Sequence, residues 1–573
     1  MSETAVAEVT GLRISYRAGA RRVVVADDVS FRLEPGRTLG LVGESGSGKS
    51  TVARTLLGHL RAGSFVDAGS VTVLGEDVFA LPSERLRRLR GAEVSLVSQN
   101  AGHALTPSMR VGAQIREALA VHGLPCDDAR IVELLTLVRL PSPASLARRH
   151  AHELSGGQQQ RVAIAMAVAT NPKILVLDEP TTALDVVTQA AVLALVDDLR
   201  ATLGMAVLIV SHDLGVVSAV ADEMLVLDHG RVVEHGPTTE VLHTPRADET
   251  RTLIQAAPRI HGVDMPAVRD LAEADVVVRC RDVDVRYPRA ATLAVHGVDL
   301  ELRRGETVAI VGESGSGKST VAAALAGLVP VERGDAHLWT ADGARHDLLG
   351  VAGRRPLDVR RSVQLVFQNA DLALNPRRTV GDAIARPLSV FRRARGRAAQ
   401  RDVVSRLLTE VGLSPDVALR LPAQLSGGQR QRVGIARALA AEPSVLIADE
   451  ITTALDVSVQ AEVLALLDDL RRARGLSCLF ISHDLAVVRS VADRIVVMNE
   501  GRVVETAPTA SLFASPRHPY TRMLLDAVVE PGHTDLPSSD ADSRVLDLDP
   551  AAALVDVGDG HRVRADRGAR TTP

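Results

Sequence analysis

The sequence predicts an α/β fold class built twice, because a glycine-rich phosphate-binding loop follows an apolar strand and precedes a helix in each half of the chain. Glycines let the backbone curl around an anion with its N–H groups pointing inward, and the helix that follows adds its positive end. Two identical copies make a chance match negligible. The loop positions are Gly43, Glu44, Ser45, Gly46, Ser47, Gly48, Lys49, Ser50 and Thr51 in the first copy and Gly312, Glu313, Ser314, Gly315, Ser316, Gly317, Lys318, Ser319 and Thr320 in the second.

Apolar segments flank both loops. Thr38–Val42 and Thr307–Val311 run into the loops and are expected to be short strands. Val52–Leu60 and Val321–Leu328 leave the loops and are expected to be helices. This strand, loop and helix context is the one in which the pattern GxxxxGK[ST] binds phosphate.

Lysine is rare in this chain. Lysine and arginine number 66 together, yet only three of these residues are lysines, and Lys49 and Lys318 both lie in the loops. A compact ammonium group suits a phosphate loop, where a planar guanidinium would not fit. Lys173 comes before an expected strand and is interpreted as a solvated surface charge.

Composition limits the classes of function. The net charge of −4 and the isoelectric point near 6.5 argue against a surface that coats nucleic acid. The three cysteines are too far apart to suggest a metal cluster or a disulfide framework, so a reducing, cytosolic setting is expected. Met1–Thr10 does not resemble a signal peptide, and no apolar run approaches the roughly 20 residues that cross a bilayer. Any membrane role is therefore expected to depend on a partner.

An antiparallel element is expected before the first loop. Leu12–Tyr16 and Val23–Leu33 alternate polar and apolar residues as paired strands do. Tyr16 is one of only three tyrosines, and Tyr287 holds the matching place in the second half. A tyrosine here is expected to stack on an adenine ring, and the alternative is a strand residue that packs on a neighbour.

A glutamine follows the next apolar strand in each half. Gln99 comes after Val94–Val97 and lies 51 residues after Gly48, and Gln368 lies 51 residues after Gly317. This equal spacing favours function over chance. An amide at a strand tip beside a phosphate loop can reach a Mg²⁺ ion or the attacking water.

A second helix start with glycines lies downstream. Leu154–Gln158 reads LSGGQ and leads into the expected helix Gln159–Val168, so that backbone N–H groups are exposed to an anion. Further on, Ile174–Leu177 is expected to be a buried parallel strand, and it ends in the carboxylates of Asp178 and Glu179.

With the phosphate loop and the glutamine, these motifs resemble the nucleotide-binding domain of an ABC ATPase. The resemblance implies two P-loop NTPase domains, each with a mixed-sheet core, an antiparallel β-subdomain and a helical subdomain, and it implies ATP and Mg²⁺ as cofactors. Asp178 would hold Mg²⁺ through water, and Glu179 would be the catalytic base that polarises the hydrolytic water. His212 matches the switch histidine that contacts the γ-phosphate, and Ala183–Asp185 matches the D-loop that passes signals between sites.

The resemblance assigns the remaining roles residue by residue. Catalytic roles are expected for Glu179, Glu450, His212 and His483. Metal contacts are expected from Ser50, Gln99 and Asp178 in the first half and from Ser319, Gln368 and Asp449 in the second. ATP contacts are expected from both phosphate loops, from Tyr16 and Tyr287, and from Ser155, Gly156, Gly157, Gln158, Ser426, Gly427, Gly428 and Gln429.

The second half repeats every landmark at nearly constant spacing. Lys318 follows its counterpart by 269 residues, and Glu450 follows its counterpart by 271. Two residues were therefore gained between the glutamine and the Ser-Gly-Gly segment, in the expected helical subdomain, while the catalytic spacing was kept. One departure is Ile451 in place of Pro180. Because proline fixes the turn after the glutamate, the sequence predicts the geometry of Glu179 more closely than that of Glu450.

ABC ATPase domains dimerise head to tail, so that each ATP lies between one phosphate loop and the Ser-Gly-Gly segment of the other domain. The resemblance therefore implies that Lys49 and Glu179 share a site with Ser426, and that the second loop and its carboxylate share one with Ser155. Because both sets are intact, two hydrolytic sites are expected, with ATP closing the dimer and hydrolysis reopening it.

Two further segments narrow the resemblance. The ATPase subunits of oligopeptide, dipeptide and nickel importers carry segments similar to Gln368–Pro376 and to Ser515–Thr521, which contains HPYT. The first half departs from this pattern, because it has Thr244–Thr250 in place of the HPYT segment. The expected partners are two transmembrane permease subunits and an extracytoplasmic substrate-binding protein, without nucleic acid. The chain is then expected at the cytoplasmic face of the membrane, bound there through its partners only. Peptides are the expected cargo, and nickel, a glutathione-like compound or another small solute remains open.

A soluble class of twin-cassette ATPases that act on ribosomes or DNA is the alternative. Its translation-factor type carries a long charged helical linker and its DNA-repair type carries zinc-ligand cysteines, and this sequence shows neither feature.

The expected domains are residues 1–258 and 275–529, with a linker at 259–274 and a mobile, acidic, proline-rich tail at 530–573. Within that tail, Leu554–Arg564 is expected to form either a short hairpin or a disordered end.

Overall fold

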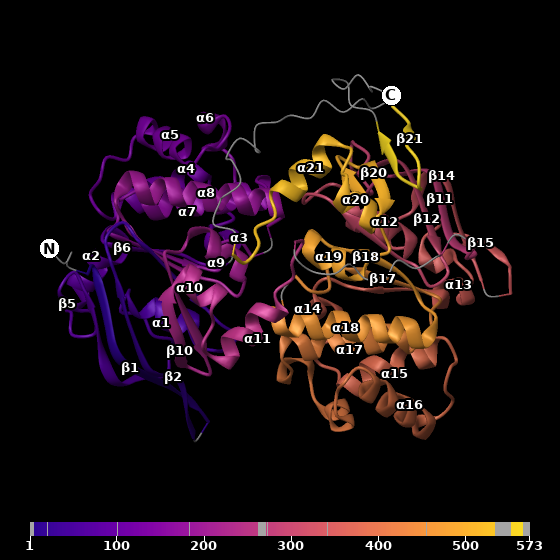
Figure 1. Ribbon diagram of the computed structural model, residues 1–573, viewed down its shortest axis with the longest axis horizontal. Helices are drawn as coiled ribbons and strands as arrows, with labels where there is room; N and C mark the ends of the chain where they lie inside the picture. The colour runs from indigo at the N-terminus through magenta and orange to yellow at the C-terminus, as the bar shows by residue number, and fades with distance from the viewer. Residues whose placement is uncertain are drawn as a thin grey trace. The chain divides into compact units, whose positions relative to one another are not determined.

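A computed structural model describes residues 5–19, 21–99, 101–182, 184–261, 271, 273–340, 342–453, 455–532 and 552–564. These residues form two compact units, the first built mainly from residues up to 257 and the second mainly from residues 258 onward (Figure 1). Residues 262–270 and 272 of the expected linker, and residues 533–551 and 565–573 of the expected tail, lie outside the described residues.

The core of the first unit is a six-stranded mixed sheet in the order β10-β9-β3-β8-β7-β6. Neighbours from β9 to β6 pair in parallel, and β10 pairs antiparallel with β9. Every residue of β3, β7 and β8 is buried, as expected of strands that are covered on both faces. The strands are β3 (Thr38–Val42), β6 (Val94–Val97), β7 (Ile174–Asp178), β8 (Ala206–Val210), β9 (Glu223–Asp228) and β10 (Arg231–Pro237).

An antiparallel sheet in the order β2-β1-β4-β5 precedes and follows the first phosphate loop in sequence. Its buried side chains, including Ile14 and Phe31, join one apolar cluster with Leu41 of β3, and this burial fixes the sheet against the core. The expected antiparallel pair is confirmed, although the first strand is longer at both ends. The strands are β1 (Ala7–Ala18), β2 (Arg21–Leu33), β4 (Ser64–Val73) and β5 (Glu76–Asp77).

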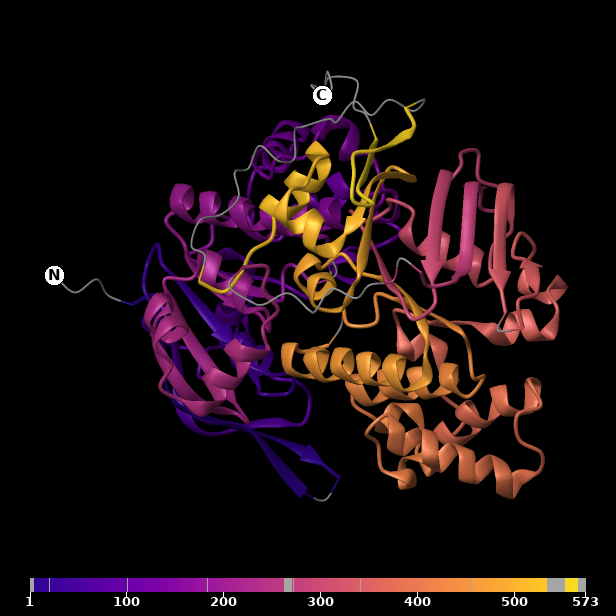
Figure 2. The same ribbon diagram turned by 45° about the vertical axis from the view of Figure 1, so that its right-hand side comes forward.

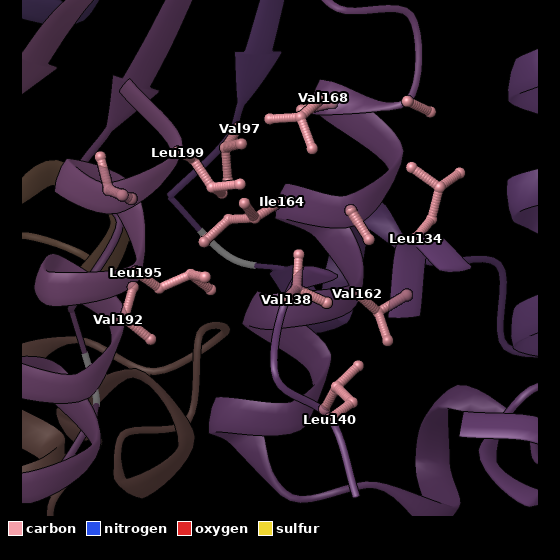
Figure 3. Close-up of a cluster of buried hydrophobic side chains, with 14 of the residues drawn as sticks. Val97, Leu134, Val138, Leu140, Val162, Ile164, Val168, Val192, Leu195 and Leu199 are labelled. Carbon is pink, nitrogen blue, oxygen red and sulfur yellow. The ribbon is translucent and has the colours of Figure 1, made fainter. Parts of the chain in front are cut away.

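The helical subdomain of the first unit packs against β6 and the helices beside it. Val97 at the end of β6, Ile164 of α7 and Leu195 of α8 meet in one buried cluster (Figure 3). Gln99 follows the end of β6 by two residues, so this packing fixes the strand end from which Gln99 leaves the sheet. The helices are α1 (Lys49–Thr55), α2 (Ser83–Ala92), α3 (Ala101–Ala104), α4 (Val111–Ala120), α5 (Asp128–Leu137), α6 (Pro143–Leu146), α7 (Gly156–Val168), α8 (Val186–Leu203), α9 (Leu214–Val220), α10 (Thr238–His243) and α11 (Asp248–Ala256).

The second unit repeats this architecture, with a four-stranded antiparallel sheet in the order β12-β11-β14-β15 and a mixed core sheet. The antiparallel sheet and the helices α15 and α16 stand out from the core as separate subdomains (Figure 2). Both units therefore confirm the expected fold class. The antiparallel strands are β11 (Val276–Val285), β12 (Val295–Arg303), β14 (Val331–Trp339) and β15 (Arg345–Asp347), and the helices are α12 (Lys318–Leu325), α13 (Leu357–Ser362), α14 (Ala370–Ala373), α15 (Val380–Val390), α16 (Arg397–Glu410), α17 (Gly427–Leu439), α18 (Val457–Arg474), α19 (Leu485–Val491), α20 (Thr509–Ala514) and α21 (Pro519–Asp526).

A C-terminal hairpin extends the second core sheet, whose order is β16-β17-β18-β13-β19-β20-β22-β21. β22 pairs antiparallel with β20, and Glu505 lies opposite Val563 in that register. Of the two alternatives for the end of the chain, the hairpin is the one found. The strands are β13 (Thr307–Val311), β16 (Val363–Val366), β17 (Val445–Asp449), β18 (Ser477–Ile481), β19 (Arg494–Asn499), β20 (Arg502–Pro508), β21 (Leu554–Asp556) and β22 (Arg562–Arg564).

The two helices after the loops begin and end earlier than the sequence predicts. α1 and α12 start at the loop lysines, because Gly48 and Gly317 end the loops with a φ of 99°. The helices stop before Gly58 and Gly327, whose φ values of 56° and 75° do not fit a right-handed helix. Among the described helices, none combines the length and the apolar character needed to span a bilayer.

Candidate functional site

The two phosphate loops adopt nearly the same backbone. Gly43, Gly46 and Gly48 have φ values of 147°, 83° and 99°, all in the range that favours glycine. A Cβ atom on Gly43 would lie 2.0 Å from the Leu227 carbonyl oxygen, whereas a Cβ atom on Gly46 would meet nothing within 4 Å. Glycine is therefore required at Gly43 by crowding as well as by conformation, and at Gly46 by conformation alone.

The lysine of each loop lies inside the loop. Lys49 Nζ donates to the carbonyl oxygens of Gly43 at 2.7 Å and Glu44 at 2.8 Å. Lys318 Nζ repeats the pattern with Gly312 at 2.8 Å and with the next carbonyl at 2.7 Å. Burial lowers the pKa of Lys49, and the nearby carboxylates of the site partly offset this effect. Each ammonium thus lies inside the loop that the sequence predicts to bind phosphate.

A hydroxyl and a carboxylate meet at the start of each loop helix. Ser50 Oγ donates to Asp178 Oδ1 at 2.7 Å, and Ser319 Oγ donates to Asp449 Oδ1 at 2.9 Å. The two pairs bring together the residues that the sequence predicts as metal ligands in each half. Burial raises the pKa of Asp449, and the negative charge of Glu450 acts in the same direction.

Arg54 is part of this cluster in the first unit only, and the sequence analysis missed it. Its guanidinium donates to Asp178 Oδ2 at 3.0 Å. The signal was available, because Arg54 lies four residues after Ser50 on α1 and such residues share one face of a helix. In the second unit the corresponding residue, 269 positions later, is Ala323.

The two proposed catalytic glutamates sit in a strained backbone just beyond the core strands. Glu179 and Glu450 have φ values of 52° and 47°, which are uncommon for residues other than glycine and occur often at functional sites. The two φ values are close, although Ile451 stands where the first unit has Pro180. Thr182 Oγ1 donates to Glu179 Oε2 at 3.1 Å, a contact that the sequence analysis also missed.

The glutamine of each unit forms a hydrogen bond with the glutamate of the same unit. Gln99 Nε2 donates to Glu179 Oε2 at 2.7 Å, and Gln368 Nε2 donates to Glu450 Oε2 at 2.6 Å. Each amide thus contacts the glutamate, while the serine and aspartate form the neighbouring oxygen pair. The glutamine lies at the proposed site in both units, and its predicted contact with Mg²⁺ stays a prediction.

A histidine approaches the other oxygen of each glutamate. His212 Nδ1 lies 3.4 Å from Glu179 Oε1, and His483 Nδ1 lies 3.6 Å from Glu450 Oε1. Burial acts to raise the pKa of Glu179, but the hydrogen bond and charge of His212 outweigh it and hold that pKa below its usual value. Burial likewise acts to lower the pKa of His212, and Glu179 outweighs it, so this pKa is raised. The pair therefore favours its charged form.

The two tyrosines predicted to stack on adenine are partly exposed. Tyr16 and Tyr287 are 40% and 42% exposed, so their rings are available for stacking, and Tyr287 Oη lies 3.2 Å from Thr320 Oγ1 in the second loop.

The serine of each LSGGQ segment caps a helix. The hydroxyl oxygens of Ser155 and Ser426 each accept a hydrogen bond from the backbone N–H of the glutamine three residues later. Gly157 is needed at that helix start, because a Cβ atom there would lie 2.3 Å from Thr188 Cγ2. One residue of the predicted D-loop, at position 183, lies outside the described residues.

Sequence comparison decides the family. A family profile described as ABC transporter matches residues 26–182 and 295–453, which together make up more than half of the chain. The chain belongs to the ABC transporter family. This ABC protein is an ATPase with two ATP-binding domains. A second profile, described as the C-terminal region of oligopeptide/dipeptide transporters, matches residues 504–547 and assigns the ABC protein to the importer ATP-binding subunits of that family.

Relatives match the ABC protein over nearly its full length. It is 38% identical to the glutathione import ATP-binding protein GsiA of Salmonella choleraesuis (strain SC-B67), over 97% of this chain and 96% of the relative. It is 39% identical to the protein of the same name from Escherichia coli (strain K12), over 91% of this chain and 89% of the relative. Both comparisons include the two cassettes together.

One solved structure resembles the ABC protein across both cassettes. It is the complex of archaeal ribosomal stalk protein aP1 with archaeal ribosome recycling factor aABCE1, matched with a TM-score of 0.61 over 97% of this chain and 96% of that chain. The sequence identity is 20%, so this likeness concerns the fold.

Proposed function

We propose that this ABC ATPase hydrolyses ATP with both cassettes to drive the uptake of small peptides, glutathione among them, through partner permeases. The observation that carries the two-site part of the proposal is the repeated contact of Glu179 with Gln99 and His212 and of Glu450 with its own glutamine and histidine. Such a duplicated arrangement, with nearly equal distances, is expected when both cassettes perform the same chemistry.

In each cassette the loop lysine and the inward N–H groups bind the β- and γ-phosphates of ATP. Glu179 and Glu450 orient a water molecule whose oxygen forms the new bond to the γ-phosphorus while the bond to the bridging β–γ oxygen breaks. The glutamate accepts the proton of that water, and its lowered pKa keeps it ionised near neutral pH. His212 and His483 orient the carboxylate and lie where they can contact the γ-phosphate.

The residues present suit Mg²⁺. Ser50 Oγ and Asp178 Oδ1 are hard oxygen ligands 2.7 Å apart, and the corresponding pair in the second cassette is 2.9 Å apart. Mg²⁺ in nucleotide enzymes is usually held by one or two such protein groups together with phosphate oxygens and water. When bound, Mg²⁺ would neutralise charge that develops on the phosphates, with Gln99 and Gln368 nearby as the remaining predicted contacts.

Peptide cargo is supported by two observations. The C-terminal region typical of oligopeptide/dipeptide transporters is present in the second cassette, and relatives named for glutathione import match almost the whole chain. Glutathione is itself a small peptide, which favours peptides over nickel or another small solute. Transport requires the two permease subunits and the binding protein that the resemblance implies, and it would place the ATPase at the cytoplasmic face of the membrane.

A groove in the second cassette supports docking of a permease. Apolar side chains and three arginines line it, and two of the apolar ones, Leu328 and Phe367, are 53% and 40% exposed. A groove with exposed apolar side chains is typical of a surface that receives a helix of a partner. Phe367 of the groove directly precedes Gln368 in sequence, so a docked helix would be close to the residue that contacts the glutamate.

Co-purification with the permeases tests the transport proposal. We expect the chain to sediment with membranes when the permeases are co-expressed, to be released when Phe367→Asp introduces a charge into the groove, and to show ATP hydrolysis stimulated by glutathione-loaded binding protein. If the chain does not sediment with membranes that contain the permeases and sediments with ribosomes instead, the result would favour the soluble twin-cassette class. Stimulation by a nickel chelate, but by no peptide, would correct the cargo only.

Completion of each ATP site by the Ser-Gly-Gly-Gln segment of the other cassette stays a prediction from the resemblance. Ser426→Arg is expected to block hydrolysis by the first phosphate loop while leaving initial ATP binding there intact. Ser155→Arg should do the same for the second loop. Loss of ATP binding to the loop of the same cassette would contradict this arrangement.

A further inference from the structure

The HPYT segment of the second cassette contacts the phosphate loop of the same cassette. Tyr520 is 1% exposed, lies in the first turn of α21, and its hydroxyl oxygen accepts a hydrogen bond of 2.9 Å from the backbone N–H of Glu313. Glu313 is the second residue of the loop. The segment therefore reaches the loop although the two residues are 207 positions apart in sequence.

The peptide group that Tyr520 holds is also the one that holds the loop lysine. The N–H of Glu313 and the carbonyl of Gly312 belong to one planar trans peptide and point in opposite directions. That carbonyl accepts from Lys318 Nζ at 2.8 Å. Rotation of this peptide would break both contacts, so the tyrosine hydroxyl limits where Lys318 can be placed.

A buried glutamate fixes the start of the HPYT segment. Glu505 of β20 is fully buried and accepts from the N–H groups of Arg517 at 2.7 Å and His518 at 3.1 Å. His561 lies between the strands of the C-terminal hairpin, is 6% exposed, and its Nε2 lies 2.6 Å from Glu505 Oε1. The hairpin thus contacts Glu505 through His561, and Glu505 in turn binds the start of the segment that carries Tyr520.

The first cassette has the anchoring contact without the tyrosine. Glu234 accepts from the N–H groups of Arg246 at 2.8 Å and Ala247 at 3.1 Å, as Glu505 does 271 residues later. The position in register with Tyr520 is Glu249, which is exposed and carries no hydroxyl. β10 ends its sheet in the described part of the first cassette, with no hairpin strand added beside it.

We propose that Tyr520 is a positioning residue for the second phosphate loop, and that the C-terminal hairpin sets the nucleotide affinity of the second site and leaves the first site unaffected. The inference rests on the proposed role of Lys49 and Lys318 in binding nucleotide. Its physical basis is one hydrogen bond to a loop peptide, supported through Glu505 and His561. The two sites of one chain then differ in affinity although their loops have the same sequence.

Binding of a slowly hydrolysed, fluorescent ATP analogue with Mg²⁺ to the full chain tests the inference. In a Lys49→Ala background only the second loop binds, and Tyr520→Phe is expected to weaken binding about two- to ten-fold, the effect of one lost hydrogen bond. In a Lys318→Ala background Tyr520→Phe should leave the affinity unchanged. His561→Ala is expected to weaken the second site in the same way and to spare the first.

Thr521→Val is the matched control, since it removes a neighbouring buried hydroxyl that makes no hydrogen bond among the described residues. It should alter neither site. Equal affinity of Tyr520→Phe and the parent in the Lys49→Ala background would overturn the inference, as would equal weakening of both sites in step with a lower melting temperature. An effect of Tyr520→Phe without one of His561→Ala would overturn the role of the hairpin. Nucleotide binding that persists in the Lys49→Ala/Lys318→Ala double variant would instead refute the proposed lysine roles.

Discussion

The Nε2 amide of Gln99 donates a hydrogen bond of 2.7 Å to Oε2 of Glu179, the proposed catalytic base. The same bond joins Gln368 to Glu450 at 2.6 Å in the second cassette. The amide comes from the end of β6 and the carboxylate from the end of β7, so the parallel pairing of these two strands brings the residues together. A shift of either strand would therefore move the base.

Removal of the amide should slow hydrolysis more than it weakens ATP binding. Gln99→Ala is expected to lower kcat about ten-fold, because the carboxylate loses one of the bonds that orient it, while KM changes little. Gln99→Glu should be worse than Gln99→Ala, because it places a like charge beside Glu179. Steady-state kinetics of both variants check this order. A reversed order, or a change confined to KM, would contradict it.

The loop glycines should differ in tolerance. Gly46→Ala is expected to cost about 1–2 kcal/mol of stability, because its Cβ atom enters open space but the residue must keep a left-handed φ. Gly43→Ala should cost more, because its Cβ atom would lie 2.0 Å from a backbone carbonyl oxygen. Denaturant unfolding followed in parallel with nucleotide binding measures both. Equal costs for the two variants would show that crowding at Gly43 is relieved.

Arg54 should make the first site less dependent on Mg²⁺. Its side chain is 42% exposed, and it pairs with the carboxylate of Asp178, which is only 2% exposed. The guanidinium therefore offsets part of the negative charge that Mg²⁺ would otherwise neutralise. In a Lys318→Ala background, Arg54→Ala is expected to raise the ratio of nucleotide affinity with Mg²⁺ to that in EDTA about two- to five-fold. Ala323→Arg in a Lys49→Ala background is the reciprocal variant and should lower the same ratio at the second site. An unchanged ratio in both would exclude this role for the guanidinium.

The pair of His212 and Glu179 predicts a pH-dependent stability. Its histidine pKa is raised above 6.5 and its glutamate pKa is lowered below 4.5. The histidine contribution is fully present below pH 6.5 and is lost as pH rises through the raised pKa, whereas the glutamate contribution is fully present above pH 4.5 and is lost as pH falls through the lowered pKa. His212→Gln should therefore lower the melting temperature more near pH ~5.5 than near pH ~9. The same loss at both pH values would show that the histidine is neutral throughout.

Much of the site could be predicted because phosphate chemistry constrains sequence. The loops need glycines at three positions and one lysine, so the motif marks them directly. The spacing between Gln99 and Gly48 was informative as well, since β8 and β7 lie between β3 and β6 in the sheet and the same strand order recurs in the second unit. The repeat then supplied a second copy of the phosphate loop, the glutamine, the LSGGQ segment, the paired carboxylates and the histidine.

Other contacts were missed or could not be read from the sequence. Arg54 has no counterpart in the second half, so the comparison of the two halves did not mark it, and only its place four residues after Ser50 on α1 pointed to it. Tyr520 belongs to a segment that the sequence marks as typical of a subfamily, but its contact with Glu313 joins positions 207 residues apart and depends on the packing of α21. The early ends of α1 and α12 follow from glycines whose left-handed conformation only the three-dimensional structure reveals.

The most direct test of two hydrolytic cassettes is the ATPase rate of Glu179→Gln, Glu450→Gln and the double variant, with ATP binding measured beside it. We predict that each single variant loses at least half of the rate and that the double variant loses about 10²- to 10⁴-fold, the contribution of a general base, while all three still bind ATP. A single variant that hydrolyses ATP at the full parental rate would contradict the claim, because that cassette would then not be catalytic.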